Sequence, residues 1–293
     1  MKWLQFHFFP ATAQQESLED ALLAAGALSI TYQDGADQPI LEPALHETPL
    51  WDRLILTALF PGDADSAEIL EATAAGITFP LPEYRLETVE DRDWSREWMD
   101  NFHPMPFGER LWVCPSWCAP PQPDAINLLL DPGLAFGTGT HPTTALCLKQ
   151  LDGMDLRGKT VIDFGCGSGI LAIAALLLGA ESAVGIDIDP QALDASRANA
   201  ETNHIPAEKL ALYLAGQEPV VCRADLVLAN ILAGPLVALA ERLMAQLGAD
   251  GELILSGLLA EQQEEVIAAY PLLSFTATTD QGWACLRGRR KGH

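Results

Sequence analysis

Apolar and polar positions alternate in two different ways along the chain, and the change marks a boundary between two regions. In the first ninety residues, short runs with the alternation of half-buried strands surround two stretches with helical spacing. The predicted order is strand, helix, strand, strand, helix, strand, over residues 3–9, 17–25, 28–33, 54–60, 65–75 and 84–89. Ser17 is the predicted cap of the first helix. This order is typical of a small ferredoxin-like α+β domain.

After about residue 125, short apolar strands alternate with helices, which is the pattern of a parallel sheet covered on both faces. Strands are predicted at 126–130, 160–163, 183–186, 211–214, 225–229 and 252–256. Helices are predicted at 140–151, 170–178, 190–203, 236–247 and 261–269. Two closing strands, 272–278 and 283–288, are so close in sequence that they must form a hairpin, which makes one strand antiparallel. The predicted fold class is α/β: a doubly wound, seven-stranded Rossmann-like domain preceded by the ferredoxin-like domain.

The segment between the two regions has a character of its own. Residues 90–103 have the sequence of a charged helix, with Trp94 and Trp98 four positions apart on one face. These aromatic residues either pack a connector onto one domain or belong to a hinge. We expect a substrate-recognition domain at 1–89, a helical linker at 90–103 and a catalytic domain at 104–293, because 293 residues are too many for one ordinary compact domain.

Composition narrows the class of protein. Apolar residues make up 49% of the chain, enough for well-packed cores. The longest apolar run, 170–178, is far too short to span a bilayer, and too few apolar residues follow Lys2 to make a signal peptide. The six cysteines form no C-x-x-C pair, which argues against zinc or a disulfide framework. We expect a cytoplasmic, soluble, monomeric protein without a metal site.

The net charge is strongly acidic. Lys and Arg number 17 and Asp and Glu number 40, which gives −23 and disfavours nucleic acid as the main partner. Residues 1–100 hold five basic and nineteen acidic side chains, so 5 − 19 = −14 lies in the first third. This is either an ordinary solvated surface or a docking face for a basic protein.

The most informative stretch is 160–190, TVIDFGCGSGILAIAALLLGAESAVGIDIDP. A β-branched strand leads directly into Gly165, Gly167 and Gly169, which permit a sharp turn and close approach of a ligand to the backbone. A helix follows, and then a second strand with Asp187 at its carboxyl end. Strand, glycine loop, helix, strand and carboxylate together predict a βαβ nucleotide-binding unit. The alternative is a tight strand-to-helix turn that binds nothing.

The spacing within this loop favours one class of nucleotide. Dinucleotide folds prefer G-x-G-x-x-G, whereas this chain has G-x-G-x-G preceded by Asp163. An acidic residue beside the loop repels phosphate but can receive a cationic amino group. Asp187 lies twenty residues beyond Gly167, where a carboxylate accepts both ribose hydroxyls. A ligand with a ribose, a positive charge and no phosphate fits S-adenosylmethionine better than NAD.

A second glycine-rich stretch, 131–144, reads DPGLAFGTGTHPTT. Its glycines predict a flexible loop leading into the next helix, an arrangement that suits a clasp over a bound ligand. Thr143 and Thr144 are candidates for this site, or else residues that cap the helix. His141 is a structural histidine in the favoured interpretation and a general base in the other.

Gly165, Asp187 and Asn230 all lie at the carboxyl ends of predicted strands. Ligands bind at this edge of open α/β sheets, near the point where the strand order reverses, so one pocket can hold all three. Many methylases that act on planar amines carry Asn-Pro-Pro-Tyr or Asp-Pro-Pro-Tyr here. In this chain Asn230 is followed by Ile231 and Leu232, which weakens the case for a nucleobase acceptor.

Four motifs in this order resemble those of the bacterial ribosomal protein L11 methyltransferases: DPGLAFGTGTHPTT, VIDFGCGSG, GIDIDP and ANILAGPL. The match covers the catalytic half closely, and the acidic front domain and tryptophan-bearing linker are similar to that family's recognition domain and hinge. The resemblance implies S-adenosylmethionine contacts from Thr144, Gly165, Asp187 and Asn230, to which the loop spacing adds Gly167. It also implies trimethylation of lysine side chains and of the amino terminus of large-subunit ribosomal protein L11, a basic partner.

The chemistry of such a transfer needs little acid–base help. Methyl transfer from a sulfonium is an in-line displacement, so the enzyme mainly positions the two reactants and excludes water. A lysine amine attacks only when neutral, and desolvation beside a sulfonium cation lowers its pKa from about 10.4. The side-chain carbonyl of Asn230 is suited to holding the incoming amine. No residue is singled out as an acid–base catalyst.

Three other functions remain open on the sequence. The first is a methyltransferase that acts on another ribosomal or translation protein, which a substrate screen would separate. The second is an NAD-dependent dehydrogenase, which the loop spacing and Asp163 disfavour and cofactor binding would test. The third is a ribosome-assembly adaptor with a vestigial nucleotide fold, which the intact loop, Asp187 and Asn230 argue against.

Overall fold

The computed structural model describes residues 2–36, 50–90, 102–131, 139–219 and 223–291. The chain divides into two compact units, residues 1–98 and 99–293. Most of the predicted linker helix, with Trp94 and Trp98, lies outside the described residues. So does much of the glycine-rich stretch 131–144, although the described residues resume at Gly139. No helix in the described ranges is both long and apolar enough to cross a membrane.

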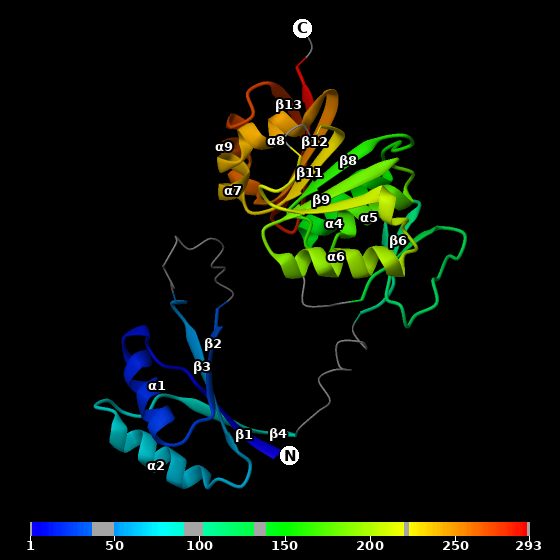
Figure 1. Cartoon of the computed structure of the whole chain (residues 1–293). Coiled ribbons are helices and arrows are strands. Elements are labelled where there is room, and N and C mark those ends of the chain that lie inside the picture. The colour runs from blue at the N-terminus through cyan, green and yellow to red at the C-terminus, as the bar shows by residue number, and fades with distance from the viewer. Residues whose placement is uncertain (1, 37–49, 91–101, 132–138, 220–222, 292–293) are drawn as a thin grey trace. The chain divides into compact units, whose positions relative to one another are not determined.

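The N-terminal unit is a four-stranded antiparallel sheet covered on one face by two helices (Figure 1). Its elements are β1 Lys2–Phe8, α1 Gln15–Ala24, β2 Ser29–Asp34, β3 Leu54–Pro61, α2 Ser66–Gly76 and β4 Tyr84–Glu90. The strands lie in the order β2-β3-β1-β4. Alternate side chains of β1, Phe6 and Phe8, are fully buried with Leu18 and Leu22 of α1 because successive strand residues point to opposite faces.

The first helix does not begin where its sequence predicts. A short 3₁₀ turn, Thr12–Gln14, leads directly into α1, and Gln14 occupies the N-cap position without a side-chain cap bond. The Gln14 side chain instead accepts a hydrogen bond from the backbone N–H of Ala11 at 3.0 Å. Ser17 lies inside the first turn, so its prediction as the cap is wrong. The second helix begins close to its predicted start at residue 65, where the Asp65 carboxylate caps α2 by accepting from the Ala67 N–H at 2.8 Å.

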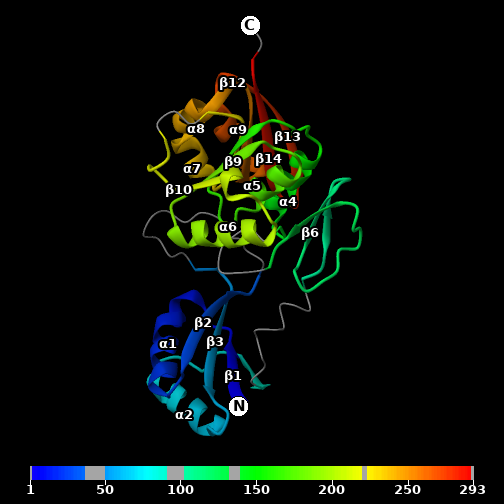
Figure 2. The ribbon, with the colours of Figure 1, turned by 45° about the vertical axis from the view of Figure 1, so that its right-hand side comes forward.

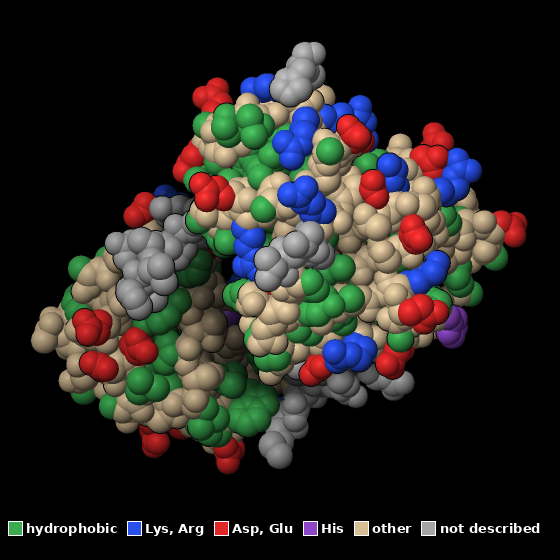
Figure 3. All heavy atoms as spheres, turned by 45° about the horizontal axis from the view of Figure 1, so that its top comes forward, with side chains coloured by type: hydrophobic (Ala, Val, Ile, Leu, Met, Phe, Trp, Pro, Cys, Tyr) green, Lys and Arg blue, Asp and Glu red, His purple; other side chains and the backbone are tan. Residues whose placement is uncertain are grey.

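Acidic side chains gather on the helical layer of this unit. Helix α1 carries Glu16, Glu19 and Asp20, helix α2 carries Glu68 and Glu71, and neither helix contains Lys or Arg. In Figure 3 the visible face of the N-terminal unit shows mainly Asp and Glu among its charged side chains, whereas the C-terminal unit shows both signs. The helical layer of the N-terminal unit is therefore acidic throughout.

The C-terminal unit is built on a seven-stranded sheet in the order β10-β9-β8-β11-β12-β14-β13. The strands are β8 Thr160–Phe164, β9 Ser182–Asp187, β10 Leu210–Leu214, β11 Ala224–Asn230, β12 Leu247–Leu259, β13 Leu273–Asp280 and β14 Trp283–Arg290. Neighbouring strands from β10 to β12 are parallel, and β14 runs antiparallel to both of its neighbours, which confirms the predicted closing hairpin.

Helices cover both faces of this sheet, as Figures 1 and 2 show. On one face lie α4 Pro142–Asp152, α5 Ile170–Leu177 and α6 Pro190–Thr202, and on the other lie α7 Ala233–Ala238, α8 Ala240–Gln246 and α9 Gln263–Ala268. Each face has its own apolar core: Ile173 is fully buried in the first and Leu243 in the second. The helix α5 is apolar on nearly every side because it packs between the sheet and its neighbours.

The predicted helix 236–247 is wrong in its start and its continuity. The helical segment begins at Ala233 and is divided at Leu239 into α7 and α8. Gly234 and Pro235 read as helix breakers in the sequence, but Pro235 occupies the third helical position, where the backbone N–H has no intrahelical partner. Strand β12 is also longer than predicted and continues through a register shift between Ser256 and Leu258.

A small three-stranded sheet precedes the large one and contains two strands that the sequence did not predict. Its strands are β5 Met105–Phe107, β6 Leu111–Cys114 and β7 Ile126–Leu129. The carboxylate of Asp152, at the end of α4, accepts from the backbone N–H groups of Glu109 and Arg110 at 2.7 and 3.1 Å. Strand β7 was predicted, but it belongs to this sheet, which packs against the α4–α5 face.

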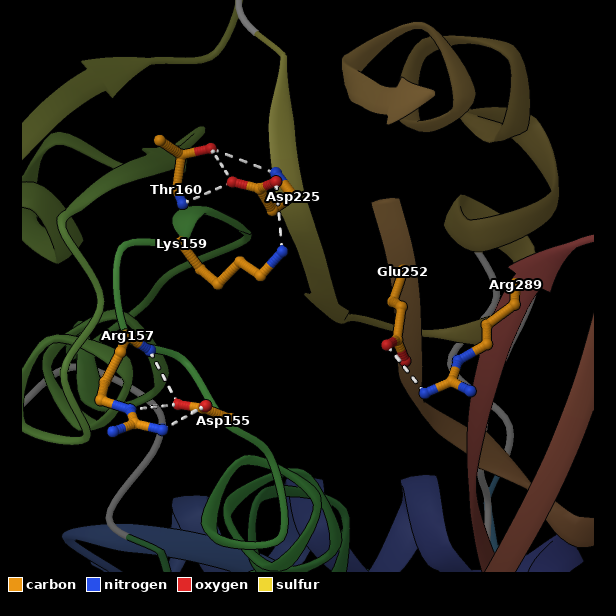
Figure 4. Close-up of polar contacts among 7 residues, drawn as sticks. All are labelled: Asp155, Arg157, Lys159, Thr160, Asp225, Glu252 and Arg289. Carbon is orange, nitrogen blue, oxygen red and sulfur yellow. Dashed lines mark hydrogen bonds and ion pairs between the residues drawn. The ribbon is translucent and has the colours of Figure 1, made fainter. Parts of the chain in front are cut away.

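Ion pairs and hydrogen bonds join the strands at the amino ends of β8 and β11, as Figure 4 shows. The Asp225 carboxylate accepts from the Thr160 N–H and hydroxyl, both at 2.9 Å, and Lys159 lies 3.6 Å from its other oxygen. On the neighbouring strands, Glu252 of β12 pairs with Arg287 and Arg289 of β14 at 2.5 and 2.9 Å. These contacts fix the register of four strands at the edge opposite the glycine loop.

Candidate functional site

A cavity of about 610 Å³ opens at the carboxyl ends of β8, β9 and β11. The chain runs outward from β8 to β9 and β10, and returns to the other side of β8 for β11, so this is where the strand order reverses. Ligands bind at such points in open α/β sheets, and the volume is in the range of small-molecule sites. Each predicted site residue lines this one cavity: Thr144, Gly165, Gly167, Asp187 and Asn230.

The glycine loop makes a turn that other residues would not make. Gly165 has φ of +78°, and a Cβ at this position would lie 2.4 Å from Cγ2 of Ile231. The N–H groups of Gly165 and Cys166 both donate to the carbonyl of Ile186 on β9, at 2.7 and 3.1 Å. The loop is thereby held against the strand that carries Asp187, and its backbone faces the cavity without a side chain in the way.

Two polar side chains of α6 support the same loop from behind. Ser196 donates its hydroxyl hydrogen to the Gly167 carbonyl at 2.8 Å, and Asn199 donates its side-chain N–H to the Ser168 carbonyl at 2.8 Å. The sequence did not single out Ser196, and the prediction that Asn199 lies on the outer side of this helix is wrong because its side chain turns toward the loop. A helix that follows the second strand of a βαβ unit must pack beside the first glycine turn, so small polar residues on its inner face were the available signal.

Asp187 is held in one orientation by the backbone. Its Oδ2 accepts from the Gly167 N–H at 2.8 Å, and its Oδ1 accepts from the Asp189 N–H at 3.0 Å. A carboxylate has about four lone-pair positions, so each oxygen keeps capacity for another donor. The side chain is therefore pre-set to accept two hydroxyl groups from a ligand in the cavity.

Asn230 ends β11 on the other side of the cavity. Its side-chain N–H donates to Oγ1 of Thr144 at 3.2 Å, and its Oδ1 is buried without a hydrogen-bond partner among the described residues. A buried acceptor that receives no hydrogen bond destabilises the folded protein by about 1–3 kcal/mol. Thr144 is itself buried in the first turn of α4. Because it accepts from the amide N–H, it fixes the Asn230 side chain with the carbonyl oxygen as the free acceptor. The site thus presents an acceptor for an N–H group.

Asp163 lies behind the loop and does not line the cavity. It is 1% exposed, its Oδ2 accepts from the Ala172 N–H at 3.1 Å, and its Oδ1 has no partner within the described ranges. Burial raises the pKa of this carboxyl to about 7, and the charge of Asp187 adds to the increase. The sequence predicted that Asp163 receives a ligand's amino group. Because Asp163 does not line the cavity, it makes no direct contact with a group bound there.

His141 is the N-cap residue of α4, and its ring belongs to the cavity wall. Its Nδ1 accepts from the Thr143 N–H at 3.3 Å, and burial lowers its pKa, so the neutral ring is favoured. The ring meets Trp283 edge-on, with centroids 4.7 Å apart. The cap is thus His141 rather than Thr143 or Thr144, and its geometry is that of a structural residue.

Several apolar wall residues were not predicted as part of the site. Ile188 is 84% exposed and follows Asp187, Leu232 is 49% exposed and follows Asn230, and both line the cavity. Their positions directly after Asp187 and Asn230 were a usable signal, because ligand pockets are lined mostly by apolar side chains. Trp283 reaches the wall from the last strand, which no local pattern indicates.

Comparisons with known proteins agree with this site. The sequence profile of the family described as Ribosomal protein L11 methyltransferase matches residues 2–291. The chain belongs to the ribosomal protein L11 methyltransferase family. A Pseudomonas fluorescens protein of that name is 58% identical over 294 residues, covering 99% of this chain and all of the relative. A Pseudomonas aeruginosa protein of that name is 57% identical, with 99% of both chains covered.

A solved structure supports the same assignment. The ribosomal protein L11 methylase of Lactobacillus delbrueckii subsp. bulgaricus is 34% identical, with a TM-score of 0.60 over 65% of this chain and all of that chain. Family membership makes the chain an S-adenosylmethionine-dependent methyltransferase with a mixed α/β sheet. The predicted family, enzyme class and methyl donor are therefore confirmed.

The residues of the cavity fit S-adenosylmethionine. Asp187 offers acceptors for ribose hydroxyls, the Gly165 turn leaves room for close approach, and the apolar wall suits a purine and a carbon chain. The unpartnered Oδ1 of Asn230 also lies in this cavity and offers an acceptor for an N–H group of a bound molecule. These placements rest on the described residues 139–219 and 223–291 of this unit.

Proposed function

We propose that this chain transfers methyl groups from S-adenosylmethionine to amines of large-subunit ribosomal protein L11, at lysine side chains and at the amino terminus. Membership of the family and full-length relatives of that name support the ribosomal substrate. The observation that carries the choice of an amine is the buried, unpartnered Oδ1 of Asn230 in the same cavity as Asp187. An N–H donor completes that acceptor, whereas a carboxylate or thiolate does not.

The proposed site residues divide the work between two walls. Asp187, Gly165 and Gly167 hold the donor through its ribose and its close approach to the backbone, and S-adenosylmethionine supplies the methyl group when bound. Thr144 and Asn230, joined by a hydrogen bond of 3.2 Å, also contact the donor, and the Oδ1 of Asn230 orients the acceptor amine. A water-poor apolar wall favours the neutral amine because burial lowers the pKa of a lysine. Positioning and desolvation then account for the rate without a strong base.

We propose the following division of the chain. Residues 1–89 form a ferredoxin-like recognition domain, 90–103 a helical linker, and 104–293 the doubly wound, seven-stranded Rossmann-like methyltransferase domain. The βαββαβ order of the N-terminal unit and its acidic helical layer support a recognition role toward a basic protein. If the linker is a hinge, motion of the recognition domain lets the catalytic domain reach several amines of the substrate protein. One fixed domain orientation in several crystal forms and in solution scattering would contradict the hinge.

The protein is further proposed to act as a cytoplasmic monomer, with no direct need for nucleic acid or a membrane. The reducing compartment fits the free thiols of Cys114, Cys118, Cys147, Cys166 and Cys285. The acidic charge of −23 is unfavourable for a nucleic-acid partner and favourable for a basic protein.

The test is labelled methyl transfer to purified ribosomal proteins. The wild-type enzyme is incubated with S-adenosylmethionine and unmethylated large-subunit proteins, and the products are mapped by mass spectrometry. Methyl groups on lysine and amino-terminal amines of L11 are the expected result. Methylation confined to another ribosomal or translation protein would keep the enzyme class but overturn the substrate, and methylation of carboxylates or of RNA would overturn the amine assignment.

A further inference from the structure

Arg242 of α8 does not line the cofactor cavity, but it contacts a residue that does. Its guanidinium carbon lies 4.9 Å from the ring centroid of Phe164, which ends β8 and lines the cavity. The Nη2 of Arg242 also donates to Oε1 of Glu218, in the segment that follows β10. One side chain thus joins an aromatic wall residue to a loop from a different strand.

Glu218 is an ionised, largely buried partner for Arg242. Its side chain is 9% exposed, and its Oε2 accepts from the Gly216 N–H at 2.7 Å. Burial raises the pKa of Glu218, but the hydrogen bonds from Arg242 and from the backbone outweigh this and leave the pKa below its ordinary value. A buried carboxylate without its counter-ion is costly, so this loop conformation depends on Arg242.

The segment held by Glu218 forms part of the cavity wall. Ala215 lines the cavity, and its N–H donates to the backbone carbonyl of Asp187 at 2.8 Å. The loop is therefore fixed at one end by the strand that carries Asp187 and at the other by Arg242. Gly216, between them, has φ of +92°, and a Cβ there would meet no described atom within 4 Å.

The topology places this wall beside the proposed adenosyl half of the ligand. Strand β10 is the outermost strand of the sheet on the β9 side, whereas α8 follows β11 on the other side of the strand-order reversal. The contact of Arg242 with Glu218 therefore joins the helix after β11 to the segment between β10 and β11, which is bonded to Asp187 through Ala215. Asn230, at the end of β11, and Thr144, in the first turn of α4, line the cavity from other elements, where the acceptor amine is proposed to bind.

We propose that Arg242 is a positioning residue that holds Phe164 and the loop 215–218 as the wall for the adenine ring. Arg242 thereby raises the affinity for adenosyl ligands and has little effect on the rate of methyl transfer. The inference rests on the proposed function, because it takes Asp187 as the ribose contact. Arg242 touches neither reactant and acts only through Phe164 and Glu218.

The test compares Arg242→Met, Arg242→Lys and Glu218→Gln with the wild-type enzyme. Calorimetry gives the Kd for S-adenosylhomocysteine and for adenosine, and steady-state assays give KM for S-adenosylmethionine and kcat. Arg242→Met removes a cation–π contact and a buried ion pair, so both Kd values and KM are expected to rise about tenfold with kcat within about twofold. Arg242→Lys keeps the charge but loses the planar fork, and its loss is expected to be about threefold.

A matched control is Arg197→Met on α6, whose guanidinium pairs with the exposed Asp194 at 2.7 Å and lies away from the cavity wall. It is expected to leave Kd, KM and kcat at wild-type values. Adenosine is the discriminating ligand because it lacks the amino-acid half of S-adenosylhomocysteine. A defect in the adenine wall weakens both ligands by the same factor, whereas a defect on the amino-acid side weakens S-adenosylhomocysteine alone. Thermal unfolding of each variant establishes that it is folded.

The outcomes separate the two proposals. Wild-type protein that fails to bind S-adenosylhomocysteine would overturn the proposed cofactor pocket. Wild-type binding with a Kd that Arg242→Met leaves within twofold, or a fall in kcat at constant Kd, would overturn the positioning role alone. If Arg242→Met does not fold, Glu218→Gln decides: it is expected to weaken both ligands about threefold, and unchanged affinity would contradict the inference.

Discussion

The two ends of strands β8 and β11 differ in whether their polar groups have hydrogen-bond partners. At the amino ends, Thr160 and Asp225 satisfy each other through three hydrogen bonds of 2.9–3.1 Å, and Lys159 balances the charge. At the carboxyl ends, Asp163 and Asn230 each bury an oxygen that no described residue satisfies. The same pair of neighbouring strands therefore carries a closed polar cluster at one end and an open one at the other.

The contrast separates stability from function. A closed cluster contributes to folding, because breaking it leaves buried or half-buried groups unpaired. An open cluster is unfavourable to folding, by about 1–3 kcal/mol for each buried acceptor. Of these two groups, Asn230 lines the cavity and can be completed by a bound ligand, whereas Asp163 does not line it. The comparison predicts that substitutions at the amino ends weaken folding and spare binding. At the carboxyl ends, a substitution of Asn230, which lines the cavity, should change catalysis, and one that removes the buried charge of Asp163 should stabilise the fold.

The largest expected effect is on catalysis at the open end. Asn230→Ala removes the acceptor proposed to hold the amine, so kcat is expected to fall about 100- to 1,000-fold, with the Kd for S-adenosylhomocysteine within about threefold. Steady-state assays and calorimetry measure the two quantities. The matched control is Asn127→Ala, which should leave kcat unchanged. The Asn127 amide donates to the Gln122 and Ala125 carbonyls and accepts from the Cys114 thiol, all beside the small sheet. Equal losses from the two variants would contradict the assignment.

The next effect is a pH-dependent gain in stability from Asp163→Asn. The folded pKa of about 7 lies above the unfolded value near 3.9, so the folded protein holds an extra proton between these values. Wild-type stability therefore falls as pH rises from about 4 to about 7, and the asparagine variant lacks this loss. Urea unfolding at pH 5 and pH 8 should show the variant gaining on the order of 3 kcal/mol relative to wild type at the higher pH. A pH-independent difference would be evidence that Asp163 is ionised throughout.

A smaller effect in the opposite direction is expected at the closed end. Asp225→Ala leaves the Thr160 N–H and hydroxyl without their acceptor, so unfolding should become easier by about 1–2 kcal/mol. Denaturant titration measures this loss. Because the hydrogen bonds from Thr160 hold the pKa of Asp225 below its usual value, the stabilisation is present above pH 4 and is lost as pH falls through the folded pKa. Loss of kcat in a folded Asp225→Ala protein would show that the two ends are not independent.

The smallest effect is expected from Glu252→Gln. Its carboxylate is 20% exposed between Arg287 and Arg289, so the pairs are partly screened, and the loss should be about 0.5–1 kcal/mol. Raising the salt concentration should reduce the difference between variant and wild type. A loss that persists unchanged in high salt would point to packing rather than charge.

Much of the fold could be predicted from the sequence where local pattern and tertiary structure agree. The glycine loop, β9 and Asp187 lie within 31 consecutive residues, 160–190, so spacing alone predicts their arrangement. Asn230 was predicted because it follows a buried strand whose end must share an edge with the loop. Gly165 was predicted for the same reason, and the φ of +78° explains why glycine stands there.

What could not be predicted depends on distant packing. Strands β5 and β6 are three and four residues long, too short for a periodic signal, and distant residues hold them in place: Asp152 anchors the turn between them, and Phe107 and Leu111 pack into the core. The start of the α7–α8 segment was misplaced because Pro235 reads as a breaker although its missing N–H is harmless in a first turn. Arg242 and Trp283 reach the cavity from elements 50 or more residues beyond the glycine loop, so no local pattern connects them with it.

The most direct test of the two-ended account is calorimetric titration of three proteins with S-adenosylmethionine: wild type, Asp187→Ala and Asp225→Ala. Both variants remove one carboxylate from the same sheet, at opposite ends. The account predicts that Asp187→Ala weakens binding about 100-fold through lost ribose hydrogen bonds, while Asp225→Ala binds as wild type but unfolds more easily. Binding indifferent to Asp187, or weakened equally by both substitutions, would contradict it.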